Sequence, residues 1–418
     1  MEVLQDTYKD TKIGRIPKDW EVVRLKKLLS KPTEYGANAS AIDFTEHTYR
    51  YIRITDILSD GRLNKTGIVG ILKQEGKKYL LNQDDIIIAR TGNTVGKSHL
   101  YNNTDGDCAY AGYLIRFVVN EELLLPQYLF QYLQSNLFWN WVKRIVRTGA
   151  QPNINSKEYQ SMNIPLPKIP EQQKIADILS TVDEQISTTD KIIEKSKELK
   201  KGLMQRFFLN KAYMIMSLGK LEKTELMPIR FNQLGKILTG TTPPTANKEY
   251  YDTEDYMFIG PADLGKVKDV KNSKKYISVK GFDVTRKLPE NALMVVCIGA
   301  TIGKIGLTTE PCATNQQVNT IVPKDEYSAR YLYYVIGGLK KYLLGFAGDT
   351  ATPQLNKTDF GKVVTFIHKS KSERTKIAAI LSEADAKIEK EQEQKTKLEQ
   401  LKKGLMQQLL TGKKRVKV

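Results

Sequence analysis

Two glycine-bounded turns that end in lysine are the residues of this chain most suggestive of phosphate chemistry. Residues 91–98 read Thr-Gly-Asn-Thr-Val-Gly-Lys-Ser, and residues 299–304 repeat the pattern as Gly-Ala-Thr-Ile-Gly-Lys. A nucleotide-binding P-loop has four residues between its glycines and a Ser or Thr after its lysine. Both turns have three residues there, and Ile305 follows the second lysine. The spacing argues against an ATP site. It favours a tight turn that brings backbone N–H groups and a lysine to a phosphate backbone, with a purely structural hairpin as the alternative.

The sequence lacks the residue groupings of the common enzyme classes. It has no Asn-Pro-Pro-aromatic or Asp-Pro-Pro-aromatic tetrapeptide, the nearest being Thr-Pro-Pro-Thr at 242–245, no dinucleotide fingerprint and no Pro-Asp pair to begin a nuclease motif. His47, His99 and His368 are far apart in sequence, and the three cysteines form no CxxC pair. We therefore predict no catalytic residue, no metal site and no disulfide, and we interpret the chain as a binding protein.

The positive charge of the chain narrows the kind of partner. Its 418 residues carry a formal net charge of +18, and most of the excess lies outside the long helices described below. Such a surface most often binds a polyanion, because each Lys or Arg that neutralises a phosphate releases a counterion. A basic surface that only keeps the protein soluble is the alternative. No apolar run approaches the ~18 residues of a membrane span and no secretory signal is evident, so we expect a soluble, cytoplasmic protein.

An internal repeat predicts how these turns are positioned. Residues 174–180, Lys-Ile-Ala-Asp-Ile-Leu-Ser, return almost unchanged at 376–382, which is 202 positions later. Residues 199–205, Leu-Lys-Lys-Gly-Leu-Met-Gln, return unchanged at 401–407, again 202 positions later. A chain too long for one ordinary core, with such a duplication, predicts two globular parts and two long helices.

The globular parts repeat less closely than the helices. The segment Gln-Pro-Asn-Ile-Asn at 151–155 pairs with Thr-Pro-Gln-Leu-Asn at 352–356, and the glycine turns correspond in the same way. β-branched runs bounded by Gly, Asn and Pro predict strands, and the segments 128–146 and 331–344 predict helices. Each half is therefore expected to mix α and β structure.

The closely repeated segments have the spacing of long amphipathic helices. Apolar residues recur every three or four positions over roughly five heptads between charged flanks, which favours a coiled coil. At ~1.5 Å per residue each helix would be about 55 Å long. Two independent surface helices, each packed on its own domain, are the alternative. The residues expected on the apolar stripe are Ile175, Leu179, Val182, Ile186, Ile193, Leu199 and Leu203 in the first helix, and Ile377, Leu381, Ile388, Leu398, Leu401 and Leu405 in the second.

Together these motifs resemble the DNA-specificity (S) subunits of type I restriction-modification systems. The matching residues are Ile-Gly-Arg-Ile-Pro-Lys-Asp-Trp-Glu-Val at 13–22, the turn at 90–97, Gln-Gln-Lys-Ile-Ala at 172–176, and the Leu-Lys-Lys-Gly-Leu-Met-Gln segment used twice. The resemblance covers essentially the whole chain. The second copy departs from the pattern, with Cys-Ile at 297–298 where the first has Arg-Thr, and Ser-Glu-Arg-Thr at 372–375 in place of the glutamine pair.

The resemblance implies an α+β protein with an internal pseudo-two-fold repeat. A first target-recognition domain would occupy 1–168, a central conserved helix 169–210, a second recognition domain 211–370, and a C-terminal conserved helix with a basic tail 371–418. The helices would form an antiparallel coiled coil that pairs the repeated stripe residues and docks two methyltransferase subunits, and through them the restriction subunits. Each domain would read half of a split site in double-stranded DNA. S-adenosylmethionine, ATP and Mg would belong to the partners, and this chain would be non-catalytic. The alternative function is a stand-alone structural or RNA-binding coiled-coil protein with basic end domains.

Polar residues in the loops are the candidates for contacting DNA. Asn and Gln can bond adenine, and Arg and Lys guanine, at major-groove edges. In the first domain the candidates are Arg90, Thr91, Asn93, Arg144, Arg147, Gln151, Asn153 and Asn155. In the second they are Gln316, Gln317, Thr350, Thr352, Gln354 and Asn356. Phosphate contacts are expected from Lys77, Lys78, Lys97, Lys304, Lys340 and Lys341. At each position an ordinary solvated or capping residue is the alternative.

Overall fold

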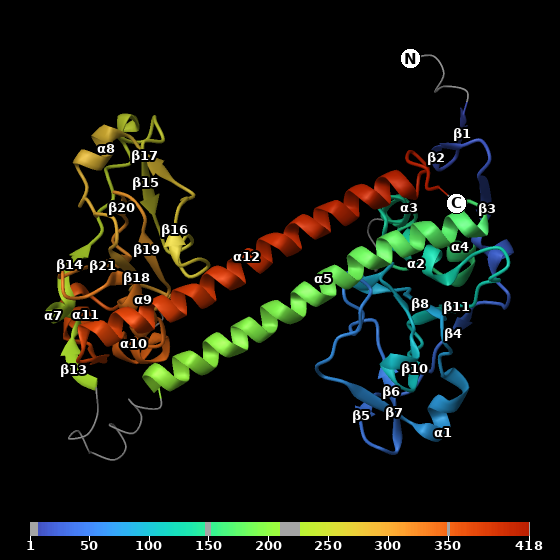
Figure 1. Cartoon of the computed structure of the whole chain (residues 1–418), viewed down its shortest axis with the longest axis horizontal. Coiled ribbons are helices and arrows are strands. Elements are labelled where there is room, and N and C mark those ends of the chain that lie inside the picture. The colour runs from blue at the N-terminus through green and yellow to red at the C-terminus, as the bar shows by residue number, and fades with distance from the viewer. Residues whose placement is uncertain (1–6, 147–151, 210–225, 349–351, 418) are drawn as a thin grey trace. The chain divides into compact units, whose positions relative to one another are not determined.

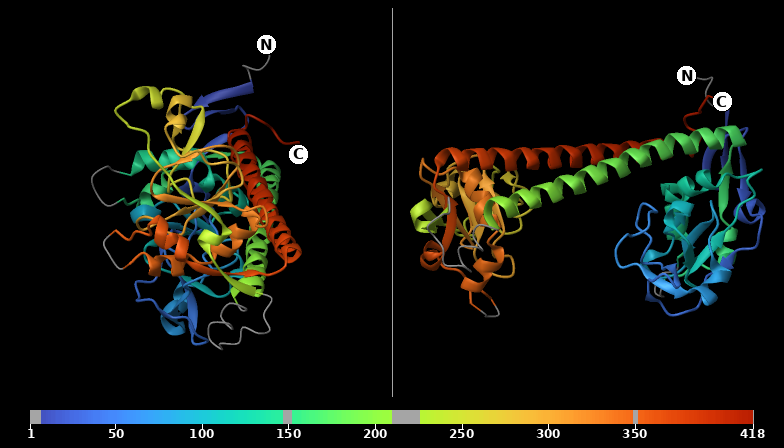
Figure 2. Two further views of the ribbon diagram at one scale, coloured as in Figure 1. Left: turned by 90° about the vertical axis from the view of Figure 1, so that its left-hand side faces the viewer. Right: turned by 60° about the horizontal axis from the view of Figure 1, so that its bottom comes forward.

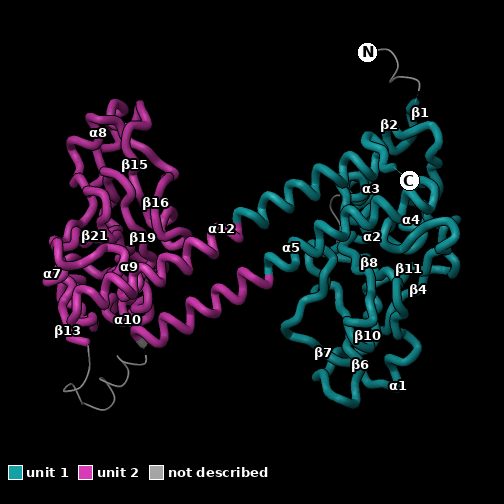
Figure 3. Tube along the Cα trace, viewed as in Figure 1, with its two compact units in different colours: residues 1–190, 393–418 teal, residues 191–392 magenta. Residues whose placement is uncertain are grey.

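The computed structural model describes residues 7–146, 152–209, 226–348 and 352–417, and the chain divides into two compact units. Unit 1 consists of residues 1–190 and 393–418, and unit 2 of residues 191–392 (Figure 3). Two long helices, α5 (Ile169–Met204) and α12 (Lys371–Leu409), contribute to both units. Within each unit a segment of α5 runs beside a segment of α12 (Figures 1 and 2). Each compact unit therefore combines one globular part with a piece of both helices.

The globular part of unit 1 is built from short strands in small sheets. The two four-stranded sheets have the orders β4-β11-β8-β9 and β10-β6-β7-β5, and the pairs β1-β2 and β12-β3 lie beside them. Strand β8 reads Ile-Ile-Ile-Ala with every side chain buried, as expected of a β-branched run covered on both faces. The strands are β1 (Tyr8–Thr11), β2 (Gly14–Pro17), β3 (Glu21–Arg24), β4 (Glu34–Tyr35), β5 (Ile42–Asp43), β6 (Thr48–Ile52), β7 (Val69–Leu72), β8 (Ile86–Ala89), β9 (Ser98–Leu100), β10 (Cys108–Tyr110), β11 (Leu114–Phe117) and β12 (Asn163–Leu166).

The helices of unit 1 correct one prediction from the sequence. The single helix predicted at 128–146 is two helices, α2 (Pro126–Gln134) and α3 (Asn136–Ile145). The break falls at Ser135, whose hydroxyl accepts a hydrogen bond from the backbone N–H of Phe138 and so caps α3. Helices α1 (Lys73–Gly76) and α4 (Ser156–Gln160) complete this part.

Unit 2 is also built from short strands in small sheets, with different numbers of strands in each sheet. A five-stranded sheet of order β14-β21-β18-β19-β16 lies with the sheet β17-β15-β20 and the pair β13-β22. The predicted helix at 331–344 is again two, α9 (Ala329–Gly337) and α10 (Lys340–Phe346). The strands are β13 (Leu226–Arg230), β14 (Gly235–Thr239), β15 (Tyr256–Ile259), β16 (Asp269–Val270), β17 (Tyr276–Ile277), β18 (Leu293–Val296), β19 (Ile305–Thr308), β20 (Ala313–Thr314), β21 (Val318–Pro323) and β22 (Val364–His368). The other helices are α7 (Phe231–Leu234), α8 (Val279–Asp283) and α11 (Lys357–Lys362).

The main hydrophobic core of each unit joins the globular part to both long helices. In unit 1 it includes Ile175 and Leu179 of α5 and Leu409 at the end of α12. In unit 2 it includes Ile377 and Leu381 at the start of α12, with Leu203 of α5 packed against it. Burial of these side chains stabilises the helices far more than their own propensity would. Among the described residues no helix is long and apolar enough to cross a membrane.

Candidate nucleic-acid interface and helix surface

The glycine turn of unit 1 lies directly against the polar loop that the sequence singled out. Thr91 forms an isolated antiparallel β-bridge with Asn153. The backbone N–H of Gly92 donates to the carbonyl of Pro152 at 2.9 Å, and that of Ile154 donates to the carbonyl of Arg90 at 2.9 Å. Segments about 60 positions apart in sequence are thus neighbours in space. Of the predicted residues at this junction, Asn93 and Asn153 are exposed and Arg90 is half-buried. Thr91 is buried, which argues against the predicted contact with DNA.

The same junction recurs in unit 2 with different side chains. Ile298 bridges Gln354, Gly299 N–H donates to the carbonyl of Pro353 at 2.8 Å, and Leu355 N–H donates to that of Cys297 at 2.8 Å. The backbone scaffold is therefore shared, whereas the residues presented on it differ. Asn153 of the first loop is replaced by Gln354 in the second, and both are exposed.

The two glycines of each turn have separate roles. Gly92 and Gly299 have φ of 71° and 80°, and nothing would meet a Cβ there, so they allow the turn itself. Gly96 instead lets a helix approach, because a Cβ there would lie 3.1 Å from Trp139 of α3. At Gly303 a Cβ would lie 2.8 Å from the Lys340 side chain of α10. Part of the glycine pattern therefore has a structural role, in agreement with the alternative of a structural hairpin.

A stacked pair in unit 1, Arg90 and Tyr35, has no signal in the local sequence. The guanidinium carbon of Arg90 lies 4.9 Å from the ring centroid of Tyr35, which is 41% exposed. The Tyr35 hydroxyl accepts a hydrogen bond from the backbone N–H of Ser156 at 3.2 Å. Among the described residues the buried Nε of Arg90 has no hydrogen-bond partner. The ring and the guanidinium are thus close enough for a cation–π contact.

A third loop completes the surface in each unit and differs most between them. Arg90 N–H donates to the carbonyl of Tyr113 at 3.0 Å, and Cys297 N–H donates to that of Gln317 at 2.8 Å, so these positions correspond. Tyr113 is 60% exposed. The second copy carries amides instead, and Asn315 Nδ2 donates to Gln317 Oε1 at 3.0 Å. One loop therefore presents an aromatic ring in unit 1 and amides in unit 2.

The remaining amide candidates divide by geometry. Gln316 is exposed, and its Oε1 accepts from the Thr242 hydroxyl at 2.6 Å. Asn155 and Asn356 are N-caps, because their side-chain oxygens accept from the backbone N–H of Glu158 at 3.0 Å and of Asp359 at 2.9 Å. For these two the structure shows the capping alternative. Thr352 is exposed, and Arg144 is exposed at the end of α3. Arg147, Gln151 and Thr350 lie outside the described residues.

The lysine candidates also fall into two groups. Lys77 and Lys78 are exposed in a short turn after α1, and Lys340 and Lys341 are exposed at the start of α10. Lys97 and Lys304 are half-buried. The Lys97 ammonium donates to the carbonyl of Ile57 at 3.3 Å, so this lysine is partly engaged with the segment that follows β6.

The apolar stripe of the long helices is buried as a heptad row, with one correction. Ile175, Leu179, Val182, Ile186 and Ile193 of α5 are each 9% exposed or less. The row then continues through Ser196, which is also buried, to Leu203. In α12, Ile377 and Leu381 are buried, and Ile388, Leu398 and Leu405 are half-buried. The predicted pairing of Leu199 and Leu401 is wrong, because they are 62% and 50% exposed. Each of these leucines lies one position before the heptad row, and the residue that follows it, Lys200 or Lys402, occupies the row.

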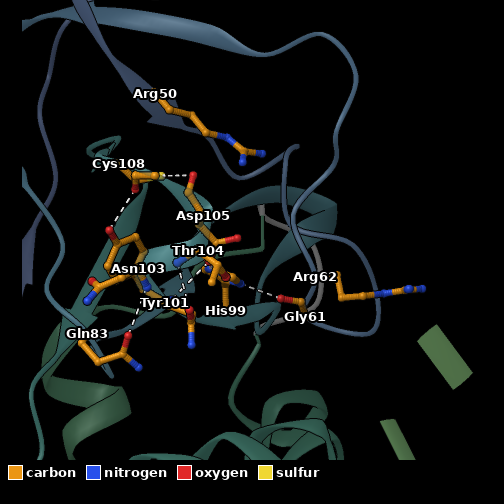
Figure 4. A network of polar contacts seen from close by, with 12 residues as sticks. Arg50, Gly61, Arg62, Gln83, His99, Tyr101, Asn103, Thr104, Asp105 and Cys108 are labelled. Atoms are coloured by element: carbon orange, nitrogen blue, oxygen red, sulfur yellow. Dashed lines mark hydrogen bonds and ion pairs between the residues drawn. The ribbon is translucent and has the colours of Figure 1, made fainter. Parts of the chain in front are cut away.

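Metal and thiol chemistry find no support in the described residues. No group of three or more His, Cys, Asp and Glu among them could hold a metal ion. All three cysteines are free and buried, and burial raises the pKa of each thiol to about 12. His99 is engaged structurally, its ring nitrogens lying 2.8 Å from the Gly61 carbonyl and 3.2 Å from Asp105 Oδ2 (Figure 4).

Comparison with known proteins defines the class of this chain. Residues 17–198 and 224–400 match the family described as type I restriction modification DNA specificity domain. The chain belongs to this family and carries its domain twice, which confirms the resemblance seen in the sequence.

Individual relatives agree with this assignment. The putative type I restriction enzyme MjaX specificity subunit of Methanocaldococcus jannaschii is 28% identical over 99% of this chain and 98% of its own length. The HindI specificity subunit of Haemophilus influenzae is 28% identical over 58% of this chain and 68% of its own. The crystal structure of an S subunit from M. genitalium has the same fold, with a TM-score of 0.66 at 16% identity and coverage of 93% of this chain and 96% of that one.

Proposed function

We propose that this chain is the DNA-specificity subunit of a type I restriction-modification complex and reads a split site, half with each globular part. The observation that carries the proposal is the interface described above. The same backbone junction of turn, polar loop and third loop occurs in both units, but it presents Arg90, Tyr35 and Tyr113 in one and Asn315, Gln317 and Gln354 in the other. A shared scaffold with different hydrogen-bonding groups is what reading two different half-sites requires. Stand-alone RNA binding is not favoured, because the family and the relatives are specificity subunits.

The proposal includes an antiparallel pairing of α5 and α12. In unit 1, Asp183 of α5 pairs with Lys402 of α12 at 2.6 Å, and Asp190 pairs with Lys395 at 2.7 Å. Seven residues forward in α5 therefore correspond to seven residues backward in α12. That step is one heptad, and it supports a coiled coil that serves as a spacer between the two reading surfaces.

Two methyltransferase subunits would dock on the repeated heptapeptides of the helices, one on each. Leu199 and Leu401 are exposed, and a Cβ at Gly202 or Gly404 would meet nothing within 4 Å. A mid-helix glycine costs about 1 kcal/mol relative to alanine, so its presence in both copies favours a close approach by a partner. S-adenosylmethionine, ATP and Mg would be bound by the partners, and this chain would supply recognition without catalysis.

Docking can be tested separately from DNA reading. Leu199→Asp and Leu401→Asp change exposed side chains and should leave thermal unfolding unchanged. Each single variant should lose one of two methyltransferase subunits in native mass spectrometry, and the double variant should lose both. Full assembly by the double variant would exclude this surface.

The function itself is tested by methylation of random DNA. The purified chain is mixed with a type I methyltransferase subunit and S-adenosylmethionine, and methylated bases are mapped over a random DNA library. A split motif with a fixed spacing is expected. The absence of a complex, or methylation without a split motif, would refute the proposal.

A further inference from the structure

One carboxylate in unit 1 joins three separate elements. Asp183 of α5 accepts from the Lys402 ammonium of α12 through Oδ1 at 2.6 Å. Its other oxygen, Oδ2, accepts from Nε2 of Gln131 in α2 at 2.8 Å, and the Gln131 side chain is almost fully buried. A single side chain thus contacts the partner helix and the globular part at once.

Unit 2 contains the same junction in its own residues. Asp385 of α12 pairs with Lys200 of α5 through Oδ1, and its Oδ2 accepts from the Tyr334 hydroxyl of α9 at 2.6 Å. Lys268, from the loop before β16, approaches the same Oδ2 at 3.5 Å. Again one carboxylate holds the other long helix and the globular part.

The two junctions are copies of one another. Asp183 and Asp385 are 202 positions apart, and so are Lys200 and Lys402, which is the offset of the helix repeat. Gln131 and Tyr334 occupy corresponding places in α2 and α9, three residues after the buried Tyr128 and Tyr331. The helix that supplies the aspartate in one unit supplies the lysine in the other.

The contacts of unit 2 differ from ordinary surface ion pairs, which contribute little, whereas the Asp183 side chain of unit 1 is 34% exposed. Asp385 is 8% exposed and Lys268 is 6% exposed, and the ammonium groups of Lys200 and Lys268 lie 5.6 and 5.7 Å from the centroid of the Tyr334 ring. Burial, together with the hydrogen bond to Asp385, raises the pKa of Tyr334, so this hydroxyl stays a proton donor. A buried charge that loses its partner is strongly destabilising, so a change of geometry that separates the charges of this junction is unfavourable.

Unit 1 adds a second clamp beside its junction. Arg62 donates to Asp190 Oδ2 at 2.8 Å, and Asp190 also pairs with Lys395. The loop that carries Arg62 is itself held, because the preceding residue, Gly61, has its carbonyl 2.8 Å from the His99 ring (Figure 4). In both units, therefore, a basic loop residue of the globular part, Arg62 or Lys268, reaches an aspartate on a long helix.

The polar groups also select one alignment of the helices. A slip of α12 by one heptad would place Leu409 opposite Asp183 in one direction and Ile388 opposite Asp190 in the other. Each slip leaves a carboxylate facing an apolar side chain, and such polar seam residues are known to specify register.

We propose that Asp183 and Asp385 are positioning residues. They fix the register of the long helices and the position of each globular part on those helices. The register of the helices and the position of each globular part on them together set the spacing of the two reading surfaces. The junctions therefore determine the spacer length of the split site. This inference rests on the proposed function.

The test uses the full chain in complex with methyltransferase subunits. Asp183→Lys and Lys402→Asp each place like charges together, whereas the double variant restores an ion pair with its charges exchanged. Gln131 can serve either arrangement, because its amide both donates and accepts. Asp177→Lys is the matched control, because Asp177 is exposed on the same helix. Its carboxylate accepts a hydrogen bond from the side-chain amide of Gln173, which also belongs to α5.

Two measurements separate positioning from mere stability. Thermal unfolding of the chain without DNA should show lower melting temperatures for both single variants and recovery in the double variant. The second measurement is methylation of a library whose half-sites are separated by different spacer lengths. In the single variants, discrimination against a spacer one base pair longer should fall by roughly tenfold. It should recover in the double variant and stay unchanged in Asp177→Lys.

Several outcomes would overturn the inference. No recovery of the melting temperature in the double variant means that the two residues are not coupled. Recovery of melting with an unchanged spacer preference in both single variants means that the junction only stabilises the fold. A wild-type complex that methylates no split site refutes the proposed function instead, while the melting series still decides whether the junction couples helix and domain.

Discussion

Arg415 offers a sharp test of how the end of the chain is held in unit 1. Its guanidinium donates two hydrogen bonds to Glu171, at 2.7 and 2.9 Å, and two to Asp19, at 2.9 and 2.8 Å. Glu171, at the start of α5, also accepts from the indole N–H of Trp20 at 3.0 Å. The residues after α12 are thereby tied to the first domain and to α5. We predict that Arg415→Ala loosens this attachment.

The size of the effect follows from exposure. The Glu171 side chain is only 6% exposed, so without Arg415 its charge would be buried with the Trp20 indole as its one remaining partner of those described. A buried charge left without its ion pair costs about 3–5 kcal/mol. Arg415 and Asp19 are 43% and 54% exposed, which lowers the expected loss to roughly 2–3 kcal/mol. For a unit of this size that corresponds to a decrease in melting temperature of roughly 5–10 °C.

Thermal unfolding followed by circular dichroism measures this decrease. Arg415→Lys keeps the charge but loses the bidentate fork, so it should fall between the wild type and Arg415→Ala. Lys414→Ala removes an exposed neighbouring cation and should change nothing. Unfolding of Arg415→Ala at the same temperature as Lys414→Ala would show that the Arg415 ion pairs do not stabilise unit 1.

The same ion pair predicts a pH dependence. The hydrogen bond from Arg415 holds the pKa of Asp19 below its usual value of 3.8. A carboxyl group whose pKa is depressed by folding contributes stability that is present above the unfolded pKa and is lost as the pH falls through the folded one. Wild type should therefore lose part of its advantage over Arg415→Ala below about pH 4, which melting curves across that range would show.

Three further predictions concern the helices, the interface and the cysteines. Gly404→Ala should raise the free energy of unfolding by about 0.5–1 kcal/mol, because a Cβ there meets nothing; an unchanged or lower value in urea titration counts against the open position. Arg90→Ala should relax specificity in the first half-site alone by about 1–3 kcal/mol, and Tyr35→Ala should act in the same direction; equal losses in both half-sites on methylation mapping would disprove this. Because burial raises the pKa of Cys108, Cys297 and Cys312 to about 12, the folded chain should not react with thiol reagents at pH 7, and rapid labelling would contradict their burial.

Periodicity and duplication made the long helices predictable from sequence. The stripe from Ile175 to Ile193 is buried as expected, because a heptad repeat leaves only one face of a helix apolar. The prediction failed at Leu199 and Leu401, where an apolar residue lies beside the row and a lysine lies on it. Leucine is the more hydrophobic residue, but position in the heptad outweighs hydrophobicity at these two sites.

The proposed DNA-reading surface was predictable only in part. The turn at Gly92 and the loop at Asn153 carried visible signals, and the structure brings them together. Tyr35 and Tyr113 carried none, because each reaches Arg90 through contacts between distant segments that no local pattern records. The amides at Asn155 and Asn356 looked like base readers, yet a capping residue has the same side chain, and only the backbone geometry tells the two apart.

Exchange of one globular part tests whether each part reads its own half of a split DNA site. Residues 217–368 are replaced by the corresponding residues of another specificity subunit of known site, and the methylated sequences of a random library are mapped. If each part reads independently, one half-site changes to that of the donor while the other half-site and the spacing remain. Loss or alteration of both half-sites in an assembled complex, or an unchanged site, would contradict it.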